Sequence, residues 1–241
     1  MWDVPSQGRS HRIFGHKVRR THHLFSDLEL AVFLPLEWQQ DVTDIREQFP
    51  LQRELTIEIA DQYGITHPSA SGVLQYMTSD FLVDTSRSDK MRVALQAKYS
   101  DELQKPRMIE KLELERRYWE QKGVHWHLVT EKEISSVALE NIKWLYPAQR
   151  DEIEDADLKH RADFYSHHFA ENKESTLINL AKSLEVAYDL APGESLREIR
   201  QLLSQRVFSF DINIAFRKLA PRDLVAAEAV TLEEMLHVQN Q

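Results

Sequence analysis

The sequence predicts an α/β fold followed by a mainly α-helical region. Over the first 130 residues, strand-like segments, in which apolar and polar side chains alternate, are interspersed with segments whose apolar residues have helical spacing. After that point helical spacing dominates, and little strand-like alternation remains. A chain of 241 residues with 42% hydrophobic side chains can form one large domain or two smaller ones. We therefore predict two domains, residues 1–130 and residues 131–241.

The first half is predicted to contain a capped helix near its start. Ser26 precedes an apolar pattern that runs to about Trp38, and Glu29 stands three residues later, as in a capping box. The other predicted elements of this half are an extended segment over 41–49, a helix over 51–63 ending at Gly64, strands over 78–84, 91–98 and 124–129, and a long helix from Pro106 to about Gly123.

The second half is predicted to begin at a helix start. Thr130 followed by Glu133 resembles a capping pair, so a boundary is predicted near Thr130 with a helix directly after it. Helical patterns cover about 131–145, 158–170, 175–188 and 195–204. The stretch RVFSFDI then alternates over a short distance, which is typical of a wing or a hairpin.

Composition excludes several functional classes. The net charge of −9 does not suit a uniformly basic DNA coat, and the absence of Cys excludes disulfides, thiolate zinc sites and a cysteine nucleophile. The six Gly residues form no phosphate-binding loop, and the common serine-hydrolase and zinc-protease motifs are absent. No long apolar run or signal-peptide layout occurs, so we expect a cytoplasmic protein without a membrane partner.

A basic arm precedes the first helix of this acidic chain. Between Asp3 and Asp27 there is no acidic residue. The cations of this segment, our predicted DNA-binding residues, are Arg9, Arg12, Lys17, Arg19 and Arg20. Clustered cations bind DNA by displacing counterions from its phosphates. The alternative is a solvated surface strand or tail without such a role.

The two strands around residues 86–89 predict a polar cluster. If the hairpin is centred on Ser88, Asp80 lies opposite Gln96, and Lys98 shares their face because strand side chains alternate. A carboxylate, an amide oxygen and the Ala97 carbonyl are the oxygen ligands that Mg²⁺ prefers. The alternative is an exposed hairpin face with a weak ion pair.

These residue types together suit phosphodiester hydrolysis. Lys98 could orient water and offset phosphate charge, and Glu29 could complete the metal site from the first helix. Taken alone, Glu29 is better explained as a helix-capping residue. The long helix after Pro106 holds Glu115, Arg116 and Arg117, which we interpret as structural ion-pairing residues, with roles at a second metal or a phosphate as the alternative.

Several longer stretches resemble one protein family. They are GRSHRIFGHK, THHLFSDLELAVFLPLEW, DIREQFPL, TSDFLVD, LQAK, EKLELERRYW and NIKWLY, which lie in order between about Gly8 and Tyr146. Together they resemble the TnsA family, the endonuclease subunits of heteromeric cut-and-paste transposases. The resemblance implies a restriction-endonuclease-like mixed sheet flanked by helices, with a PD-(D/E)xK core. It also implies a catalytic set of Glu29, Asp80, Gln96 and Lys98, with Mg²⁺ as the cofactor, Mn²⁺ as a substitute, and Glu29, Asp80 and Gln96 as the metal ligands.

The resemblance also implies a specific role and partners. The enzyme would cut the 5′ strands at transposon ends, while a TnsB-type transposase cuts the 3′ strands and joins them to target DNA. The winged-helix-like C-terminal domain would dock on a TnsC-type AAA+ ATPase in the bacterial cytoplasm. Residues 131–241 hold 13 Lys and Arg against 20 Asp and Glu, which favours protein contacts over DNA binding. The alternatives are a non-catalytic assembly factor bridging transposase and ATPase, and a free-standing restriction-type nuclease.

Overall fold

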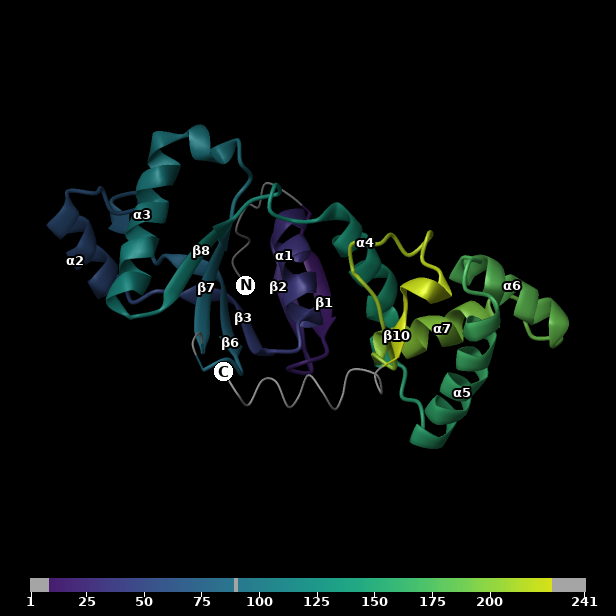
Figure 1. Ribbon diagram of the computed structural model, residues 1–241. Helices are drawn as coiled ribbons and strands as arrows, with labels where there is room; N and C mark the ends of the chain where they lie inside the picture. Colours follow the sequence, from purple (N-terminus) through teal and green to yellow (C-terminus); the bar gives the residue numbers. More distant parts are fainter. Residues whose placement is uncertain (1–8, 89–90, 227–241) are drawn as a thin grey trace. The chain divides into compact units, whose positions relative to one another are not determined.

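The computed structural model describes residues 9–88 and 91–226, and the chain divides into two compact units. The N-terminal unit is Met1–Ile134 and the C-terminal unit is Ser135–Gln241. The division lies a few residues beyond Thr130, where the sequence predicts a boundary, and the assignment of two domains stays a prediction. Figure 1 shows the elements of both units along the chain.

A four-stranded mixed sheet forms the centre of the N-terminal unit. Its strands, in spatial order, are β3 (Val42–Pro50), β6 (Thr78–Thr85), β7 (Arg92–Ala97) and β8 (His125–Val129). Strand β6 runs antiparallel to both β3 and β7. Strand β8 runs parallel to β7, and the long helix α3 (Pro106–Gln121) connects the two. This mixed sheet with flanking helices confirms the predicted α/β fold class.

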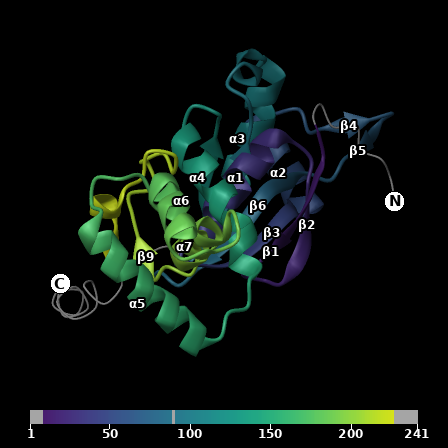
Figure 2. The same cartoon turned by 90° about the vertical axis from the view of Figure 1, so that its right-hand side faces the viewer.

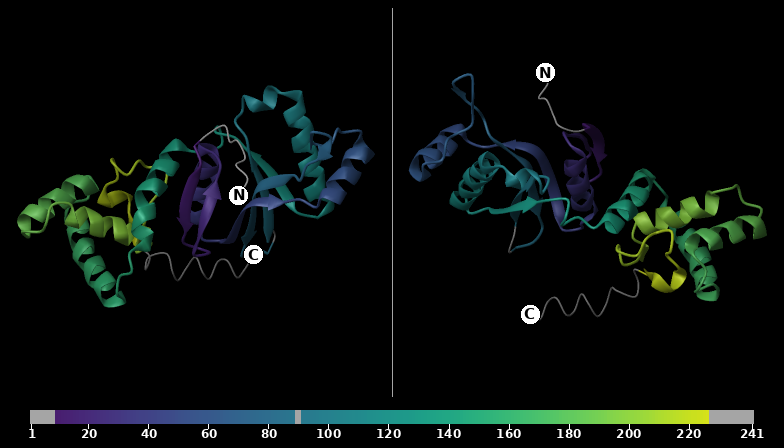
Figure 3. Two further views of the ribbon diagram at one scale, coloured as in Figure 1. Left: turned by 180° about the vertical axis from the view of Figure 1, so that it is seen from behind. Right: turned by 90° about the horizontal axis from the view of Figure 1, so that it is seen from above.

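Helices cover both faces of this sheet. On one side lies α1 (Asp27–Trp38) with a hairpin of β1 (His11–Gly15) and β2 (Arg20–Leu24), and on the other lie α2 (Arg53–Tyr63) and α3 (Figure 3). Leu82 and Ala94 of the sheet pack with Leu114 and Trp119 of α3 in one buried cluster. Full burial of Leu114 contributes about 1.5–3 kcal/mol to folding. These layers fix the strand ends that carry the polar cluster.

Local signals set the ends of the N-terminal helices. The Ser26 side chain accepts a hydrogen bond from the Glu29 backbone N–H at 3.0 Å and so caps α1, as predicted. Helix α2 ends at Gly64, whose φ of 65° is a left-handed conformation that glycine adopts without steric cost. A small ladder of β4 (Ser69–Ala70) and β5 (Val73–Leu74) follows, and the sequence did not predict it.

The C-terminal unit is mainly helical (Figure 2). Its α-helices are α4 (Ser136–Leu145), α5 (Asp155–Glu171), α6 (Leu177–Ala187) and α7 (Glu194–Ser204). It also contains the short 3₁₀ turns η2 (Tyr146–Arg150) and η3 (Pro221–Asp223), whereas η1 (Glu102–Gln104) belongs to the N-terminal unit. Tyr165, Leu177 and Ile199 are buried in its core. The predicted helices over 158–170, 175–188 and 195–204 are confirmed within a few residues at each end.

Two predictions for this half need correction. The helix expected directly after Thr130 begins only at Ser136, because the Glu133 carboxylate bonds the Thr130 N–H and hydroxyl within a turn and Ser135 caps the helix instead. Within RVFSFDI only β9 (Phe208–Ser209) is a strand, and it pairs with the later strand β10 (Val225–Ala226) rather than within a local hairpin. The winged-helix-like character of this unit stays a prediction.

Candidate active site

The hairpin of β6 and β7 brings the predicted polar residues together. Phe81 pairs with Leu95 and Leu82 with Ala94, so the hairpin is centred on Ser88 as the sequence predicts. The same register places Asp80, near the start of β6, beside the C-terminal end of β7. Asp80 is only 5% exposed, which means that its carboxylate is held by protein groups rather than by bulk water.

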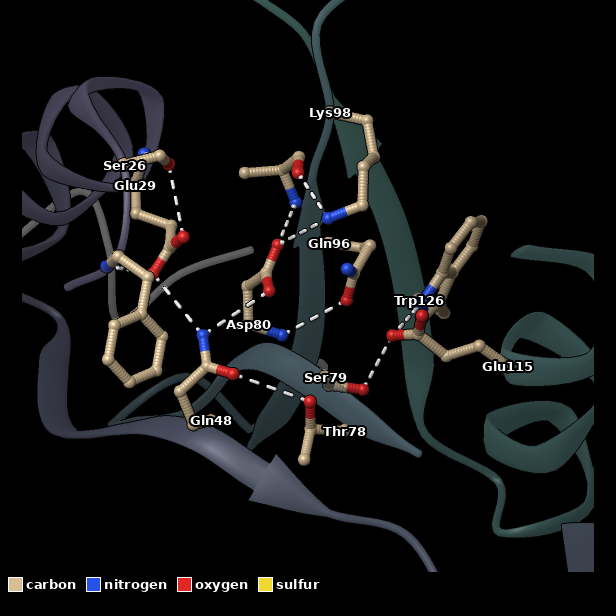
Figure 4. A network of polar contacts seen from close by, with 12 residues as sticks. Ser26, Glu29, Gln48, Thr78, Ser79, Asp80, Gln96, Lys98, Glu115 and Trp126 are labelled. Atoms are coloured by element: carbon tan, nitrogen blue, oxygen red, sulfur yellow. Dashed lines mark hydrogen bonds and ion pairs between the residues drawn. The ribbon is translucent and has the colours of Figure 1, made fainter. Parts of the chain in front are cut away.

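Four protein groups fix Asp80 (Figure 4). Its Oδ2 accepts hydrogen bonds from the Ala97 backbone N–H at 2.8 Å and from Lys98 Nζ at 3.3 Å. Its Oδ1 accepts from Gln48 Nε2 at 3.4 Å. Its own backbone N–H donates to Gln96 Oε1 at 3.0 Å. Asp80 is therefore oriented on every side before any ligand arrives.

Lys98 lies where β7 has just ended. Its Nζ donates to the Ala97 carbonyl oxygen at 2.9 Å as well as to Asp80 Oδ2, and about a quarter of its side chain is exposed. The ammonium group thus combines fixed partners with access to solvent. Such a group can donate a hydrogen bond to an incoming phosphate oxygen without first rearranging.

Glu29 reaches the same place from the first turn of α1. Its Oε1 accepts from the Ser26 hydroxyl at 3.0 Å, and its Oε2 accepts from the Phe25 backbone N–H at 2.9 Å and from Gln48 Nε2 at 3.2 Å. Burial raises the pKa of Glu29, and the neighbouring Asp80 carboxylate raises it further. The capping role and the site role of Glu29 therefore coexist.

These side chains line one cavity of about 520 Å³ in the N-terminal unit. Its lining includes the buried acids Glu29 and Asp80, the cation Lys98 and the aromatic residues Phe25 and Tyr99. The other charged residues that line it are Asp101, Glu102, Lys105 and Glu131. Within the described ranges no three His, Cys, Asp or Glu side chains gather closely enough to hold a metal ion by themselves. An ion here would need two carboxylates together with amide or backbone oxygens, and the Ala97 carbonyl is such an oxygen.

The position of Gln96 defines its first task. Its amide oxygen accepts the Asp80 backbone N–H across the two strands, and the side chain is buried. One lone pair of that oxygen is therefore used to hold Asp80 in place, and the second is left for another partner. The structure brings Gln96 to the site, and its role as a metal ligand stays a prediction.

Glu115 of α3 lies behind the site rather than in it. Its Oε1 accepts from the Ser79 hydroxyl at 2.6 Å and from Trp126 Nε1 at 2.9 Å. Burial raises its pKa to about 7, and the hydrogen bonds from Ser79 and Trp126 oppose that rise. The ion pairs of Arg116 and Arg117 with Glu113 agree with the structural interpretation of this helix.

Replacement of Glu115 by glutamine is expected to change the pH dependence of stability. The folded pKa near 7 exceeds the usual 4.5, so the carboxyl favours folding most below about pH 4.5, and this contribution is lost as the pH rises to about 7. Glutamine keeps the oxygen that accepts both bonds and carries no charge. In urea unfolding, the free energy of unfolding of the variant relative to that of the wild type should rise by about 1 kcal/mol or more between pH 5 and pH 8. A difference that does not change with pH would contradict this.

The predicted DNA-binding residues fall on and beside the hairpin of β1 and β2. Arg9, Arg12 and Arg19 are exposed. Lys17 lies in the turn, where its backbone N–H contacts the buried Glu37 carboxylate at 3.4 Å. Their role in binding DNA stays a prediction.

Arg20 differs from the other cations of the arm. Its guanidinium donates to Glu47 Oε1 at 2.8 Å and to the Ile45 carbonyl at 2.9 Å. Burial alone would raise the pKa of Glu47, but hydrogen bonds from His22 and Arg20 outweigh it and hold that pKa well below its usual range. Arg20 therefore fastens the hairpin to β3, a structural task that the sequence did not reveal.

Gln48 is the site residue that sequence reasoning missed. It lies in β3 and contacts both acids, yet a single Gln among the charged residues of 41–50 carries no recognisable motif. Its φ of 50° is rare for a residue with a side chain, and only the structure shows it.

Glu29, Asp80 and Lys98 meet in one cavity beside a mixed sheet, a set of groups that suits a phosphodiester-cleaving enzyme. Family models match twice, as "TnsA-like endonuclease N terminal" over residues 39–131 and as "TnsA endonuclease C terminal" over residues 133–212. The chain is 47% identical over 238 residues to "Transposon Tn7 transposition protein TnsA" of Escherichia coli. The matched region covers 99% of this chain and 87% of that relative. The chain thus belongs to the TnsA family and is a DNA endonuclease of transposition.

Membership of the TnsA family has two further implications, one for the cofactor and one for the partners. An endonuclease of this family suggests use of a divalent metal, and its relative implies a transposase complex with other Tns proteins. Within the described ranges, every helix is too short or too polar to span a lipid bilayer.

Proposed function

We propose that this chain is the Mg²⁺-dependent subunit that cuts the 5′, non-transferred strands at transposon ends during excision. The observation that carries the proposal is the convergence of Glu29, Asp80 and Lys98 in one cavity of a TnsA-family chain. These are three of the four residues that the resemblance assigns to catalysis, and the fourth, Gln96, contacts the Asp80 backbone. Mn²⁺ is expected to substitute for Mg²⁺ because both accept oxygen ligands in octahedral geometry.

The residues of the cavity fit a hard divalent cation. Gln48 contacts both carboxylates, so Glu29 and Asp80 lie one amide group apart, and Lys98 Nζ donates to both Asp80 and the Ala97 carbonyl oxygen. All of these donors are oxygen atoms, as Mg²⁺ requires. When bound, the ion would supply Lewis-acid polarisation of the scissile phosphate. Glu29, Asp80 and the Ala97 carbonyl would hold it, with the free lone pair of Gln96 as a further donor.

The remaining chemistry belongs to Lys98. Its ammonium group is held against Asp80 and the Ala97 carbonyl, so it enters the reaction already oriented. From there Nζ can donate a hydrogen bond to a phosphate oxygen and offset the negative charge that builds up in the transition state. The same group can orient a water molecule for attack on phosphorus.

Exposed cations of the N-terminal hairpin are the proposed DNA contacts, together with Lys17. Replacement of Arg9, Arg12 and Arg19 by glutamine should lower affinity for transposon-end DNA and reduce the slope of log K against log salt by about one for each phosphate that is no longer neutralised. Arg20→Gln should mainly lower the melting temperature, because Arg20 pairs with Glu47. Salt-dependent binding measurements on both variants test this. An unchanged slope in the triple variant would contradict the assignment.

The proposed partners follow from the same family role. A TnsB-type transposase would cut and join the 3′ strands, and the C-terminal unit would contact a TnsC-type AAA+ ATPase. Acidic residues outnumber basic ones in residues 131–241, which favours protein contacts over DNA binding for that unit.

Strand-resolved cleavage of end-labelled transposon-end DNA tests the proposed function. The wild-type chain is combined with its cognate transposase and ATPase in Mg²⁺, Mn²⁺, Ca²⁺ or EDTA. Breaks in the 5′ strands that need Mg²⁺ or Mn²⁺ are the expected result. An assembled complex that cuts only the 3′ strands would contradict it and would support the non-catalytic assembly factor instead.

A further inference from the structure

The Gln48 side chain lies between Glu29 and Asp80, the two buried acids of the cavity. Gln48 Nε2 donates to Glu29 Oε2 at 3.2 Å and to Asp80 Oδ1 at 3.4 Å, while its Oε1 accepts from the Thr78 hydroxyl at 3.3 Å (Figure 4). Both hydrogens of the amide nitrogen thus face carboxylates, and the amide oxygen is tethered to β6. The orientation of the amide is therefore fixed by three partners.

The backbone of Gln48 is held in an unfavourable conformation. Its φ of 50° lies in the left-handed region, although the residue has a full side chain and sits within a paired strand. Residues in such conformations persist only where the surrounding structure fixes them, and they gather at functional sites. The residues around Gln48 must therefore hold its backbone in this conformation.

The neighbours of Gln48 supply the fixing. Glu47 pairs with Phe81 and Phe49 pairs with Ser79, so the ladder to β6 continues on both sides. The Glu47 carboxylate is in turn held by Arg20 and His22 of the N-terminal hairpin. The strand therefore cannot relax at Gln48 without breaking these interactions.

We propose that Gln48 is a positioning residue that holds Glu29 and Asp80 at the spacing the divalent cation requires, and so sets the affinity of the site for that cation. This inference rests on the proposed metal-dependent function. Two carboxylates side by side repel each other, and the amide hydrogens offset that repulsion while the cation is absent. Glu29 Oε1 and Asp80 Oδ1 each accept one hydrogen bond, from the Ser26 hydroxyl and from Gln48 Nε2, and so keep a second lone pair for the cation. Gln48 therefore orients the two carboxylates without replacing them as ligands.

Two substitutions separate the amide from the backbone strain. Gln48→Gly removes the side chain and suits the left-handed backbone, and Gln48→Asn keeps an amide that is too short to contact both acids. Both variants should fold at least as stably as the wild type. Ser71→Gly is the matched control, since Ser71 also has a φ of 50° and lies in the turn between β4 and β5.

Calorimetric titration with Mn²⁺ in the absence of DNA gives the direct readout. We expect both Gln48 variants to bind Mn²⁺ about 10- to 100-fold more weakly than the wild type, as loss of a residue that orients metal ligands does elsewhere. Cleavage in the complete transposase mixture should then need correspondingly more metal, while the rate at saturating metal stays near that of the wild type. Ser71→Gly should bind Mn²⁺ like the wild type.

The outcomes distinguish this inference from the proposed function. Unchanged Mn²⁺ affinity in both Gln48 variants, with a wild type that binds and cuts, would overturn the role of Gln48 alone. A cleavage rate that stays low at saturating metal would also overturn it, because spacing of the ligands would not then be the effect. A wild type with neither metal binding nor 5′-strand cleavage would overturn the inference and the proposed function together.

Discussion

Replacement of Asp80 by asparagine is expected to abolish cleavage of the 5′ strands while the fold survives. Asparagine keeps an oxygen that can accept the Ala97 N–H, but it loses the charge that a cation and Lys98 both require. Loss of several kcal/mol of transition-state stabilisation corresponds to about a thousandfold or more in rate. Single-turnover cleavage with the complete transposase mixture measures it.

Asp84→Asn is the control for this result. Asp84 lies on the same strand, but its carboxylate pairs with Arg46 and Arg92 outside the cavity. This variant should cleave at close to the wild-type rate. If Asp80→Asn also failed to assemble with the transposase and the ATPase, Asp80 would be a structural residue and the catalytic interpretation would fail.

Replacement of Lys98 by methionine is the second large effect that we expect. Methionine preserves most of the side-chain length but cannot donate to Asp80, to the Ala97 carbonyl or to a phosphate oxygen. Removing one oriented donor from a transition state costs about 10²- to 10³-fold in rate. Cleavage should fall by that amount, and Mn²⁺ binding by calorimetry should persist because Lys98 is not a ligand.

Lys105→Met is the matched control, since Lys105 lines the same cavity while the groups that fix Asp80 come from other residues. Its cleavage rate should change far less. A Lys98→Met protein that cuts at the wild-type rate would remove Lys98 from the chemistry. If Lys98→Met lost Mn²⁺ binding as well as cleavage, Lys98 would be a residue that positions the metal ligands instead.

The sequence predicts the part of the site that depends on local patterns. Strand alternation and a turn centred on Ser88 were enough to place Asp80 beside the end of β7, because hairpin register follows from the turn. The capping box likewise predicted the start of α1 at Ser26 and therefore the position of Glu29. The bond from Asp80 to Gln96 belongs to the same register.

Other parts depend on contacts between segments far apart in the chain. Gln48 contacts Glu29 and Asp80 from a strand in which its own backbone is left-handed, and no periodicity of the sequence encodes either feature. Arg20 looked like one cation of a basic arm, yet Glu47 of another strand gives it a structural partner.

The C-terminal unit was harder to predict for a similar reason. Its helices follow from apolar spacing, but β9 finds its strand partner in β10, beyond a loop and a 3₁₀ turn. A pairing across so many residues leaves no local pattern. The start of α4 was misplaced because Thr130 and Glu133 make capping-type contacts in a turn that does not continue as a helix.

If Glu29, Asp80 and the end of β7 form one hydrolytic centre, they must bind the divalent cation together, and its location can be measured. Crystals of this chain soaked in Mn²⁺ would give an anomalous scattering peak at each ion. We expect a peak between the carboxylates of Glu29 and Asp80, within ligand distance of the Ala97 carbonyl. Fully occupied Mn²⁺ elsewhere, with these oxygens unliganded, would contradict it.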